Sequence, residues 1–585
     1  MKTILNIFVI LTISALFCSP ALKAQTNPDS LIFKAMNDEL NRNLSRLSID
    51  KHKPPFFISY QLSDAQSLSI KATLGSLVSS NELPGRNISV RLMVGDYSLN
   101  DENFIGGSGT SVGGNSLPLP LDNNYGAIRR ALWIACDQSY KRSVESYDQK
   151  LTAIKQQNNP DEEKLDDYSK ITSVSLIRQS APVKYDKAKW ESFAKNISGV
   201  FKSCPRITSS LVYLNMVNAC VYVTSNEGTR IKLPLNLACL CVNAGCQADD
   251  GESLNNQLLY YALLPEELPK TDKIKQDILQ MANNLDALSK APVIKDSYSG
   301  PVIFEGEAVA ELCTQKLLKN NSFIATRDPV FAAERPGIGR VNKLDDKINQ
   351  KICSENLTIR ETPKLKSFNN IPLIGTYEID SEGVVPKDEL TLVDKGILKT
   401  LLNDRVPTTK VKESNGHRRF ALIGPFVSAV KAPGIINISW NNGKPAKEIY
   451  RAALKEAEKN GLEYVYLIRK LEVFNPGQTR SLMSMMAGRG SALSKPIGIY
   501  RMDVKTGKEQ LVRSAVVSDF QMNNFKDIMF GSKEQMVYNT LLNSVIPVSV
   551  IAPQIMVFND VSIEKDRNAK PKLPIVPNPL LSLKQ

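Results

Sequence analysis

The sequence predicts an α+β fold in which antiparallel sheets pack against helices. Three observations support this expectation: apolar and polar residues alternate along several segments, turn residues separate those segments, and a few segments place apolar residues at helical spacing. The chain of 585 residues is longer than one hydrophobic core usually organises, and 42% of its residues are hydrophobic. We therefore expect an ordered N-terminal domain followed by a mainly-β C-terminal domain.

Residues 1–24 are typical of an export signal. An apolar run from Ile4 to Phe17 follows Lys2, and small residues offer a cleavage point before Gln25. The bulky residue before Cys18 disfavours a lipoprotein signal. No later stretch reaches the roughly 20 apolar residues that span a bilayer. We expect a cleaved signal peptide, a mature start near Gln25, a periplasmic or secreted protein, and no membrane span.

The formal net charge is +13, which raises the question of a nucleic-acid or anionic partner. The basic residues are scattered among acidic ones, as in the segment from Asp161 to Lys170. The sequence contains no basic tract interleaved with aromatic residues. Nucleic-acid binding is therefore not expected.

Residues 25–290 are predicted to form the N-terminal domain. Apolar residues at helical spacing predict an amphipathic helix from Pro28 to Leu47. Alternating residues then predict strands at Leu68–Leu74 and Ile88–Val94, with Pro84-Gly85 between them. An antiparallel meander is the simplest arrangement of these strands.

A helical insertion is predicted at about residues 125–170. Its first helix runs from Tyr125 to Gln157, where charged residues become frequent after an apolar start. Asn158-Asn159-Pro160 interrupts the pattern, and a second helical stretch is expected up to Lys170.

A hairpin is predicted after this insertion. Apolar strand-like runs at Leu211–Thr224 and Ile231–Val242 flank Asn226-Glu227-Gly228, which is a typical turn sequence. Helices between Pro265 and Ser289 then lead to the C-terminal domain, predicted at residues 291–564.

The segment from Asn103 to Asn124 is rich in Gly, Ser and Asn, which predicts a long surface loop. It contains Gly109-Thr110-Ser111-Val112-Gly113, a formal match to G-x-S-x-G. The nucleophile elbow of serine hydrolases needs a buried strand before the serine and a helix after it. Here a glycine-rich stretch precedes and Pro118 follows, so a serine hydrolase is not expected.

Three cysteines, Cys239, Cys241 and Cys246, form a C-x-C-x4-C pattern. Thiolate ligation of a metal is one interpretation, but this spacing is not a strong zinc signature. The surrounding run Leu237–Val242 is typical of a buried strand, where cysteine packs as a small hydrophobic residue. Core packing or a disulfide is therefore preferred over a metal site.

The C-terminal domain is predicted to open with a buried strand at Gly300–Phe304 and a helix from about Gly306 to Asn320. Strands and turns follow, interrupted by helices near Ala446–Asn460 and around Asn524–Phe530. Residues 565–585 carry four prolines and several lysines, which predicts an extended or disordered tail.

Several motifs of the second half resemble, in order and spacing, those of the TldD/PmbA metallopeptidase family. The stretch GPVIFEGEAVAELCTQKLL at Gly300–Leu318 is similar to the strand and helix that carry the family's H-E-x-x-x-H zinc motif. Gly375–Gly383 resembles the stretch ending in D-x-E-G, which is followed by Arg405, and Ser414–Arg418 resembles the N-G-x-R segment. Ser544–Val557 resembles the closing strand. The resemblance covers nearly the whole mature chain and implies the family's architecture.

In catalytic members of this family, two histidines and a cysteine hold zinc, and the glutamate of the motif serves as general base. Matching the motif to this chain retains the glutamate as Glu307. The two histidine positions are occupied by Gly306 and Glu311, and no cysteine follows Cys353 to supply the third ligand. The resemblance thus makes Glu307 the candidate catalytic residue and Gly306 and Glu311 degenerate ligand positions.

The chain has only two histidines, His52 and His417. We interpret His417 as part of a polar turn in preference to a site for a peptide carboxylate. Glu307 and Glu311 share one helix face, so a carboxylate site for Mg or Ca is geometrically possible. Two solvated side chains are the preferred interpretation.

The resemblance implies a non-catalytic, zinc-less subunit of an exported complex that degrades peptides. The zinc would lie in a catalytic TldD-like homologue, with a homodimer as the other possible assembly and no cofactor in this chain. Two alternatives stay open: an active metallopeptidase whose metal is held by Glu307, Glu311 and further residues, or a stand-alone peptide-binding protein. The latter would use strand edges and the Gly-rich loop from Asn103.

Overall fold

A computed structural model describes residues 28–106, 115–157, 165–179, 184–319, 322–331, 344–473, 493–567 and 573. Several predictions lie outside these ranges: the export signal and the start at Gln25, the G-x-S-x-G match, the Asn158–Pro160 interruption, and most of the tail at 565–585. In the ranges that are described, no helix combines the length and the apolar character that a membrane crossing requires.

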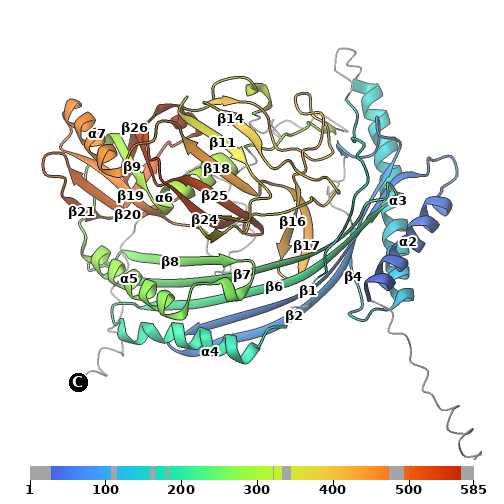
Figure 1. Ribbon diagram of the computed structural model, residues 1–585, viewed down its shortest axis with the longest axis horizontal. Helices are drawn as coiled ribbons and strands as arrows, with labels where there is room; N and C mark the ends of the chain where they lie inside the picture. The colour runs from blue at the N-terminus through green and yellow to red at the C-terminus, as the bar shows by residue number, and fades with distance from the viewer. Residues whose placement is uncertain are drawn as a thin grey trace, which may run out of the picture.

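The N-terminal half is built on one long, strongly curved sheet (Figure 1). Its strands follow the order β4-β2-β1-β6-β7-β5, and β8 pairs with the C-terminal part of β7, from Ala238 to Gln247. The long strands pair antiparallel with their neighbours, which confirms the expected fold class. The strands are β1 (Pro55–Thr73), β2 (Ser76–Val94), β4 (Asn115–Pro118), β5 (Ser175–Ile177), β6 (Ser209–Ser225), β7 (Arg230–Gln247) and β8 (Ser253–Ala262).

The hairpin predicted at Asn226-Glu227-Gly228 is confirmed, with Gly228 at φ +91° between β6 and β7. The expected interruption at Pro84-Gly85 is wrong, because β2 runs through both residues and the chain reverses direction at Leu74-Gly75.

Gly85 allows the C-terminal half to approach the sheet closely. A Cβ at this position would lie 2.5 Å from the carbonyl oxygen of Pro425, so only glycine permits this close approach.

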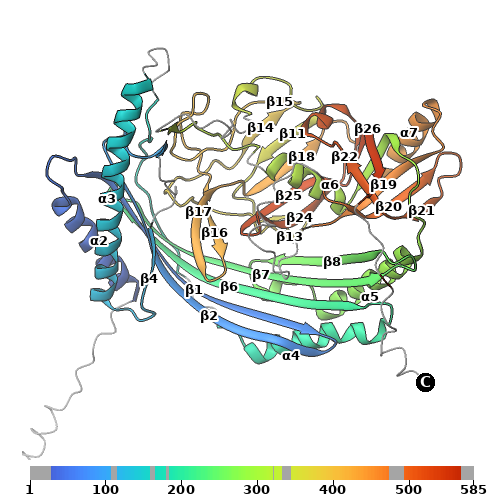
Figure 2. The same cartoon turned by 180° about the vertical axis from the view of Figure 1, so that it is seen from behind.

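Helices cover the convex face of the sheet, on the side opposite the C-terminal half (Figure 2). α2 and α3 pack over one end of the sheet, while α4 and α5 pack over the other. The helices are α2 (Pro28–Arg46), α3 (Tyr125–Gln157), α4 (Lys187–Ser198) and α5 (Thr271–Lys290). The long helices predicted from Pro28 and from Tyr125 are thus confirmed.

The second helical stretch expected up to Lys170 is wrong for its described part. Residues 165–170 form no helix. The backbone N–H groups of Asp167 and Tyr168 donate instead to the carbonyls of Ser98 and Tyr97, at 3.2 and 3.0 Å. These tertiary bonds replace the local bonds that a helix would need.

The C-terminal half contains two sheets with α6 (Glu307–Cys313) between them. One sheet has the order β15-β14-β11-β18-β25-β24, and the other β21-β20-β19-β9-β26-β22 with β23 beside β26. The first comprises β11 (Leu357–Glu361), β14 (Leu390–Asp394), β15 (Ile397–Leu398), β18 (Ile435–Trp440), β24 (Gln535–Leu542) and β25 (Ile546–Pro553). The second comprises β9 (Tyr298–Glu305), β19 (Tyr464–Leu471), β20 (Pro496–Asp503), β21 (Glu509–Val512), β22 (Ala515–Ser518), β23 (Ile528–Gly531) and β26 (Ile555–Lys565).

Smaller elements complete this half. The helix expected near Ala446–Asn460 is confirmed as α7 (Ala446–Lys459). The helix expected around Asn524–Phe530 is a 3-10 turn at Met522–Asp527 that leads into β23. The remaining strand pairs are β3 (Phe104–Ile105) with β10 (Val330–Phe331), β12 (Ser367–Phe368) with β13 (Ile371–Pro372), and β16 (Arg418–Ile423) with β17 (Phe426–Lys431).

The cysteines of the C-x-C-x4-C pattern lie in β7, are buried and form no disulfide with one another or with another described cysteine. The sequence favours core packing or a disulfide over a metal site, and the structure shows core packing. Burial raises the pKa of the Cys246 thiol to about 11, so this side chain stays neutral and behaves as a hydrophobic residue.

A buried contact between charged side chains joins the two halves. Arg405 of the C-terminal half makes two hydrogen bonds of 2.6 Å to the two carboxylate oxygens of Glu227, in the β6–β7 turn. The Arg405 side chain is only 1% exposed, and its guanidinium lies 4.0 Å from the ring centroid of Tyr168. It also donates to the carbonyl of Ser169 at 2.6 Å. The bidentate geometry fixes both the distance and the orientation of the halves.

The segment resembling the D-x-E-G motif belongs to the same contact region. Glu382 accepts the backbone N–H of Arg405 at 3.0 Å and pairs with Arg91 of β2. Asp380 accepts the N–H groups of Glu382 and Val384 at 2.9 and 2.8 Å, which shapes the turn. Burial and the neighbouring Glu382 raise the pKa of Asp380 well above its usual value. These motif residues therefore hold the two halves together.

Gly85→Ala is expected to destabilise the chain by roughly 1–3 kcal/mol, because the new Cβ would overlap the backbone and ring of Pro425. Denaturant unfolding measures the change. Gly126→Ala is the matched control, because a Cβ there meets only the Asn124 side chain at 3.5 Å. Equal stability of the two variants would contradict the close approach.

Arg405→Met is expected to lower the free energy of unfolding by roughly 3–5 kcal/mol, because it leaves the Glu227 carboxylate without its buried partner. Adding Glu227→Gln should recover part of this loss. Arg178→Gln, which removes an exposed ion pair with Glu378, should cost less than about 1 kcal/mol. Similar losses for the Arg405 and Arg178 variants in urea unfolding would refute the role of the buried pair.

Candidate functional site

The strand and helix that resemble the family's zinc motif form as predicted. β9 lies between β19 and β26, and the chain then turns into α6. The helix predicted from Gly306 to Asn320 is confirmed in its first part, but α6 ends at Cys313 and a π-helical turn at Thr314–Leu318 follows. The side chains of this segment are largely buried between the two sheets.

Gly306 lies just outside the helix, at its N-cap. Its φ of +62° belongs to the left-handed region that favours glycine, and its N–H donates to the carbonyl of Gln554 at 2.8 Å. A Cβ there would meet no atom within 4 Å, so space is available but the backbone would be strained. The position thus offers no metal ligand and is shaped for glycine.

The expectation of two solvated glutamates on α6 is wrong for one of them. Glu307 is exposed, whereas Glu311 is only 4% exposed. The side-chain amide of Gln315 donates to Glu311 at 2.8 Å, and the oxygen of that amide accepts the Ser494 N–H at 3.0 Å. Burial raises the pKa of Glu311, which favours its neutral, protonated form.

Glu307 and Glu311 line a cavity of about 290 Å³ at the junction of the two halves. One wall is the segment Asn256–Tyr260 of β8, whose other edge pairs with β7. The cavity is lined by Asn256, Gln257, Leu258, Leu259, Tyr260, Lys273, Asp277, Gln280, Met281, Asn284, Glu307, Glu311, Lys470, Leu471, Val473 and Tyr538. Residues of β8, α5, α6, β19 and β24 thus meet around one space, which we call the α6 cavity.

Several polar groups of the α6 cavity are already bound to each other. The Tyr260 hydroxyl donates to Asp277 at 2.9 Å, and Lys273 pairs with the same carboxylate at 2.6 Å. Lys470 donates to the Gln257 carbonyl at 2.6 Å. The cavity therefore combines fixed polar groups with apolar side chains, an arrangement suited to binding a small polar ligand.

Zinc does not fit the residues at this site. Gly306 provides no side chain, and Glu311 is a buried carboxyl group held by Gln315. Across the described ranges, no three His, Cys, Asp or Glu side chains are grouped so as to hold a metal. The nearest cysteine in sequence, Cys313, has its pKa raised by burial and lies within the core. The donor set of a catalytic zinc is therefore lacking.

The two histidines lie elsewhere in the molecule. The interpretation of His417 as part of a polar turn is wrong, because the residue is 1% exposed and sits where β16 begins. Its Nδ1 lies 2.8 Å from the Asn415 side-chain oxygen, and its Nε2 lies 3.7 Å from Glu361. His52 pairs with Asp148 of α3 at 3.2 Å. Neither histidine lines the α6 cavity.

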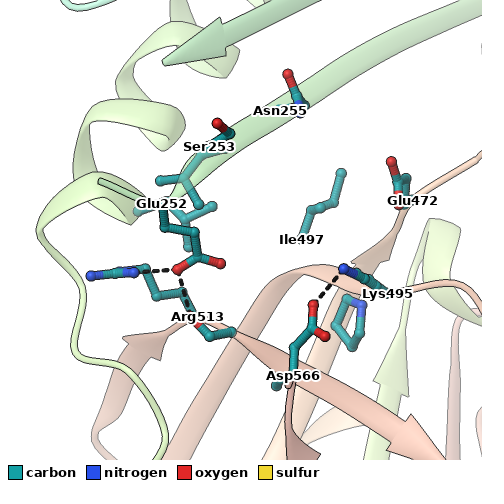
Figure 3. A pocket seen from close by; sticks show the side chains of 13 residues that line it. Glu252, Ser253, Asn255, Glu472, Lys495, Ile497, Arg513 and Asp566 are labelled. Atoms are coloured by element: carbon teal, nitrogen blue, oxygen red, sulfur yellow. Dashed lines mark hydrogen bonds and ion pairs between the residues drawn. The ribbon is translucent and has the colours of Figure 1, made fainter. Parts of the chain in front are cut away.

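A second cavity, of about 320 Å³, lies between the start of β8 and the strands β20 to β22 (Figure 3). Its two basic side chains are both neutralised by carboxylates of the chain. Arg513 binds Glu252 and Asp250, and Lys495 pairs with Asp566. Because its charged side chains already pair with one another, this cavity connects the two halves and is a weaker candidate for ligand binding than the α6 cavity.

Sequence reasoning located part of the α6 cavity and missed the rest. It placed Gly306, Glu307 and Glu311 together on the strand and helix, as the structure does. It did not identify Lys470 or Tyr538, which reach the cavity from strands far away in sequence. The only sequence signal for these residues was the alternation of apolar and polar side chains along β19 and β24. This alternation does not show which side chain will face a cavity.

Comparisons with known proteins agree with the resemblance. Residues 289–464 match the model of the PmbA/TldA metallopeptidase C-terminal domain. A metalloprotease of Methanothermobacter thermautotrophicus is 38% identical over 80 residues, which span 14% of this chain and 16% of that protein. The chain therefore aligns with only a small part of that relative.

Solved structures extend the likeness to the fold of nearly the whole chain. A proposed modulator of DNA gyrase from Thermotoga maritima shares the fold with a TM-score of 0.55 at 13% identity, over 92% of this chain and 99% of that one. TldE of Thermococcus kodakarensis gives a TM-score of 0.52 at 14% identity, over 90% and 99%. A proposed modulator of DNA gyrase from Bacteroides thetaiotaomicron gives 0.51 at 13% identity, over 92% and 98%. Residues 289–464 thus match a PmbA/TldA metallopeptidase C-terminal domain, and nearly the whole chain shares the fold of these solved structures.

Proposed function

We propose that this chain is a non-catalytic, zinc-less subunit of an exported complex that degrades peptides, with zinc held by a catalytic TldD-like homologue. The observation that carries this proposal is the chemistry of the degenerate positions. Gly306 has no side chain and a backbone conformation that disfavours histidine, and Glu311 is a buried carboxyl group whose pKa is raised by burial. A hydrolytic zinc needs neutral imidazole or thiolate donors and an open position for water.

The architecture supports a structural role. Charged residues at the positions of the family's D-x-E-G and Arg segments hold the two halves in a fixed relation through the Arg405–Glu227 contact. The α6 cavity is formed only when the halves meet in this way. A rigid subunit of this kind could position a catalytic partner and control access to a shared peptide chamber. Export follows from the sequence of residues 1–24.

A second candidate function is peptide binding by the chain alone, which one observation favours. Consecutive residues Asn256–Tyr260 of β8 line the α6 cavity along the edge not paired with β7. An open strand edge can hydrogen-bond an extended peptide, independently of its side chains. The alternative of a carboxylate-held metal at Glu307 and Glu311 lacks a third donor within the described part of the chain.

Co-purification tests the first candidate. The tagged chain, isolated from its native organism, is expected to retain an exported homologue with an intact H-E-x-x-x-H motif. The pair should hydrolyse unstructured peptides at least about tenfold faster than the homologue alone, because a docked subunit orients the active half. A histidine-to-alanine change in the homologue is the control and should abolish the activity. Activity of this chain alone, or its recovery without any homologue, would contradict the proposal; a self-complex recovered in this way would assign the homodimer in its place.

The protonation of Glu311 gives a test on the isolated chain. The usual pKa of a glutamate is 4.5, and burial raises the folded-state value above it. The stability that the protonated Glu311 side chain contributes is therefore fully present below pH 4.5 and is lost as the pH rises through the folded-state pKa. Glu311→Gln, which stays neutral, should become increasingly more stable than the wild type as pH rises from 4 to 8. The exposed Glu307→Gln variant serves as control; parallel pH curves for wild type and Glu311→Gln would show that Glu311 is ionised.

A further inference from the structure

Two charged side chains of the α6 cavity, Lys470 and Glu307, form no ion pair within 4.0 Å among the residues that the structure describes. Among the described residues, no carboxylate oxygen lies within 4.0 Å of the Lys470 ammonium, which donates only to the Gln257 carbonyl at 2.6 Å. Glu307 likewise makes no ion pair or side-chain hydrogen bond within the same part of the structure. This contrasts with Lys273 of the same cavity, whose charge is balanced by Asp277 at 2.6 Å.

Lys470 lies in surroundings where a bound anion would stabilise its charge. The side chain leaves β19 beside β8 and is enclosed enough that burial lowers its pKa, an effect that the negative charge of Glu307 partly offsets. An ammonium group has three N–H donors, and the Gln257 carbonyl occupies one of them. A cation removed from water is costly unless an anion pairs with it. The cavity beside Lys470 has room for such an anion.

The size and charges of the cavity specify the anion. A space of about 290 Å³ accommodates an amino acid or the last residues of a peptide but no large polyanion. The single unpaired cation matches one carboxylate better than a phosphate of higher charge. Glu307 lies in the same cavity and repels anions of high charge, while it can accept an ammonium or amide N–H. Apolar contacts come from Leu471 and Met281.

We propose that the α6 cavity binds the α-carboxylate of a peptide or of a free amino acid, with Lys470 as its counter-ion and Glu307 accepting a nearby N–H. The position that catalytic relatives use for zinc would thus serve in this chain to recognise the end of a peptide. The inference rests on the proposed function in one respect only: it takes peptides and the products of their hydrolysis as the available ligands. Binding is a property of the chain alone and does not require a catalytic partner.

Calorimetric titration of the purified chain with three defined probes tests the proposal. The probes are N-acetyl-trialanine with a free carboxylate, the same peptide as its C-terminal amide, and free alanine. We expect at least about tenfold weaker binding of the amide than of the acid, because the amide removes the charge that pairs with Lys470. Tight binding of the acetylated acid assigns a peptide end, and binding of alanine alone assigns a free amino acid; both support the site.

Three variants make the result specific. Lys470→Met should lower the affinity for the acid at least about tenfold and remove the preference for acid over amide, while Lys470→Arg should retain the preference. Lys290→Met is the control, because this lysine of α5 pairs with Asp286 at the surface and does not line the cavity, so the preference should stay unchanged. If Lys470→Met does not fold, the acid and amide affinities of the wild type decide alone. Equal affinities, no binding of any probe, or an unchanged preference in a folded Lys470→Met would overturn the proposal.

The outcome is independent of complex formation. A chain that captures its homologue but binds no carboxylate would refute this inference and leave the proposed function standing. A chain that binds the acid but captures no homologue would refute the partner-subunit role and favour stand-alone peptide binding.

Discussion

The bidentate contact between Arg405 and Glu227 is the interaction on which the arrangement of the two halves depends. It connects the turn of the β6–β7 hairpin to the C-terminal half, with the Arg405 side chain 1% exposed and the Glu227 side chain 11% exposed. Two buried charges tolerate little displacement, because any separation leaves each without a partner. Together with the Arg91–Glu382 and Arg513–Glu252 pairs, the contact holds the C-terminal half against the curved sheet. The α6 cavity exists only in this arrangement, since β8 and α5 belong to one half and α6, β19 and β24 to the other.

Much of the fold could be predicted from local patterns. The antiparallel sheets, the hairpin at Asn226-Glu227-Gly228 and the helix at Tyr125–Gln157 follow from periodicity and turn residues, which act over a few neighbouring positions. Errors arose where distant contacts override local preference. Pro84-Gly85 looks like a turn, yet it lies in a continuous strand because both residues pair with β1, opposite Gln66 and Ala65. The domain boundary near residue 291 stays a prediction.

The candidate site was predictable in its position but not in its chemistry. The order of motifs placed Gly306, Glu307 and Glu311 on a strand and helix, and the structure does the same. The burial of Glu311 depends on residues such as Gln315 and Ser494 that surround it only after folding. The same reason explains why Lys470 was missed: a lysine near the end of an amphipathic strand usually points to solvent, and only the packing of β19 against β8 encloses this one.

At the positions that the resemblance aligns with zinc ligands, the chain has a glycine with a φ of +62° and a buried glutamate. The central claim is that the chain holds no catalytic zinc. The most direct test is the zinc content of the purified chain, measured by mass spectrometry after dialysis against metal-free buffer. The account predicts far less than one zinc per chain; one equivalent of zinc, retained together with chelator-sensitive peptide hydrolysis, would contradict it.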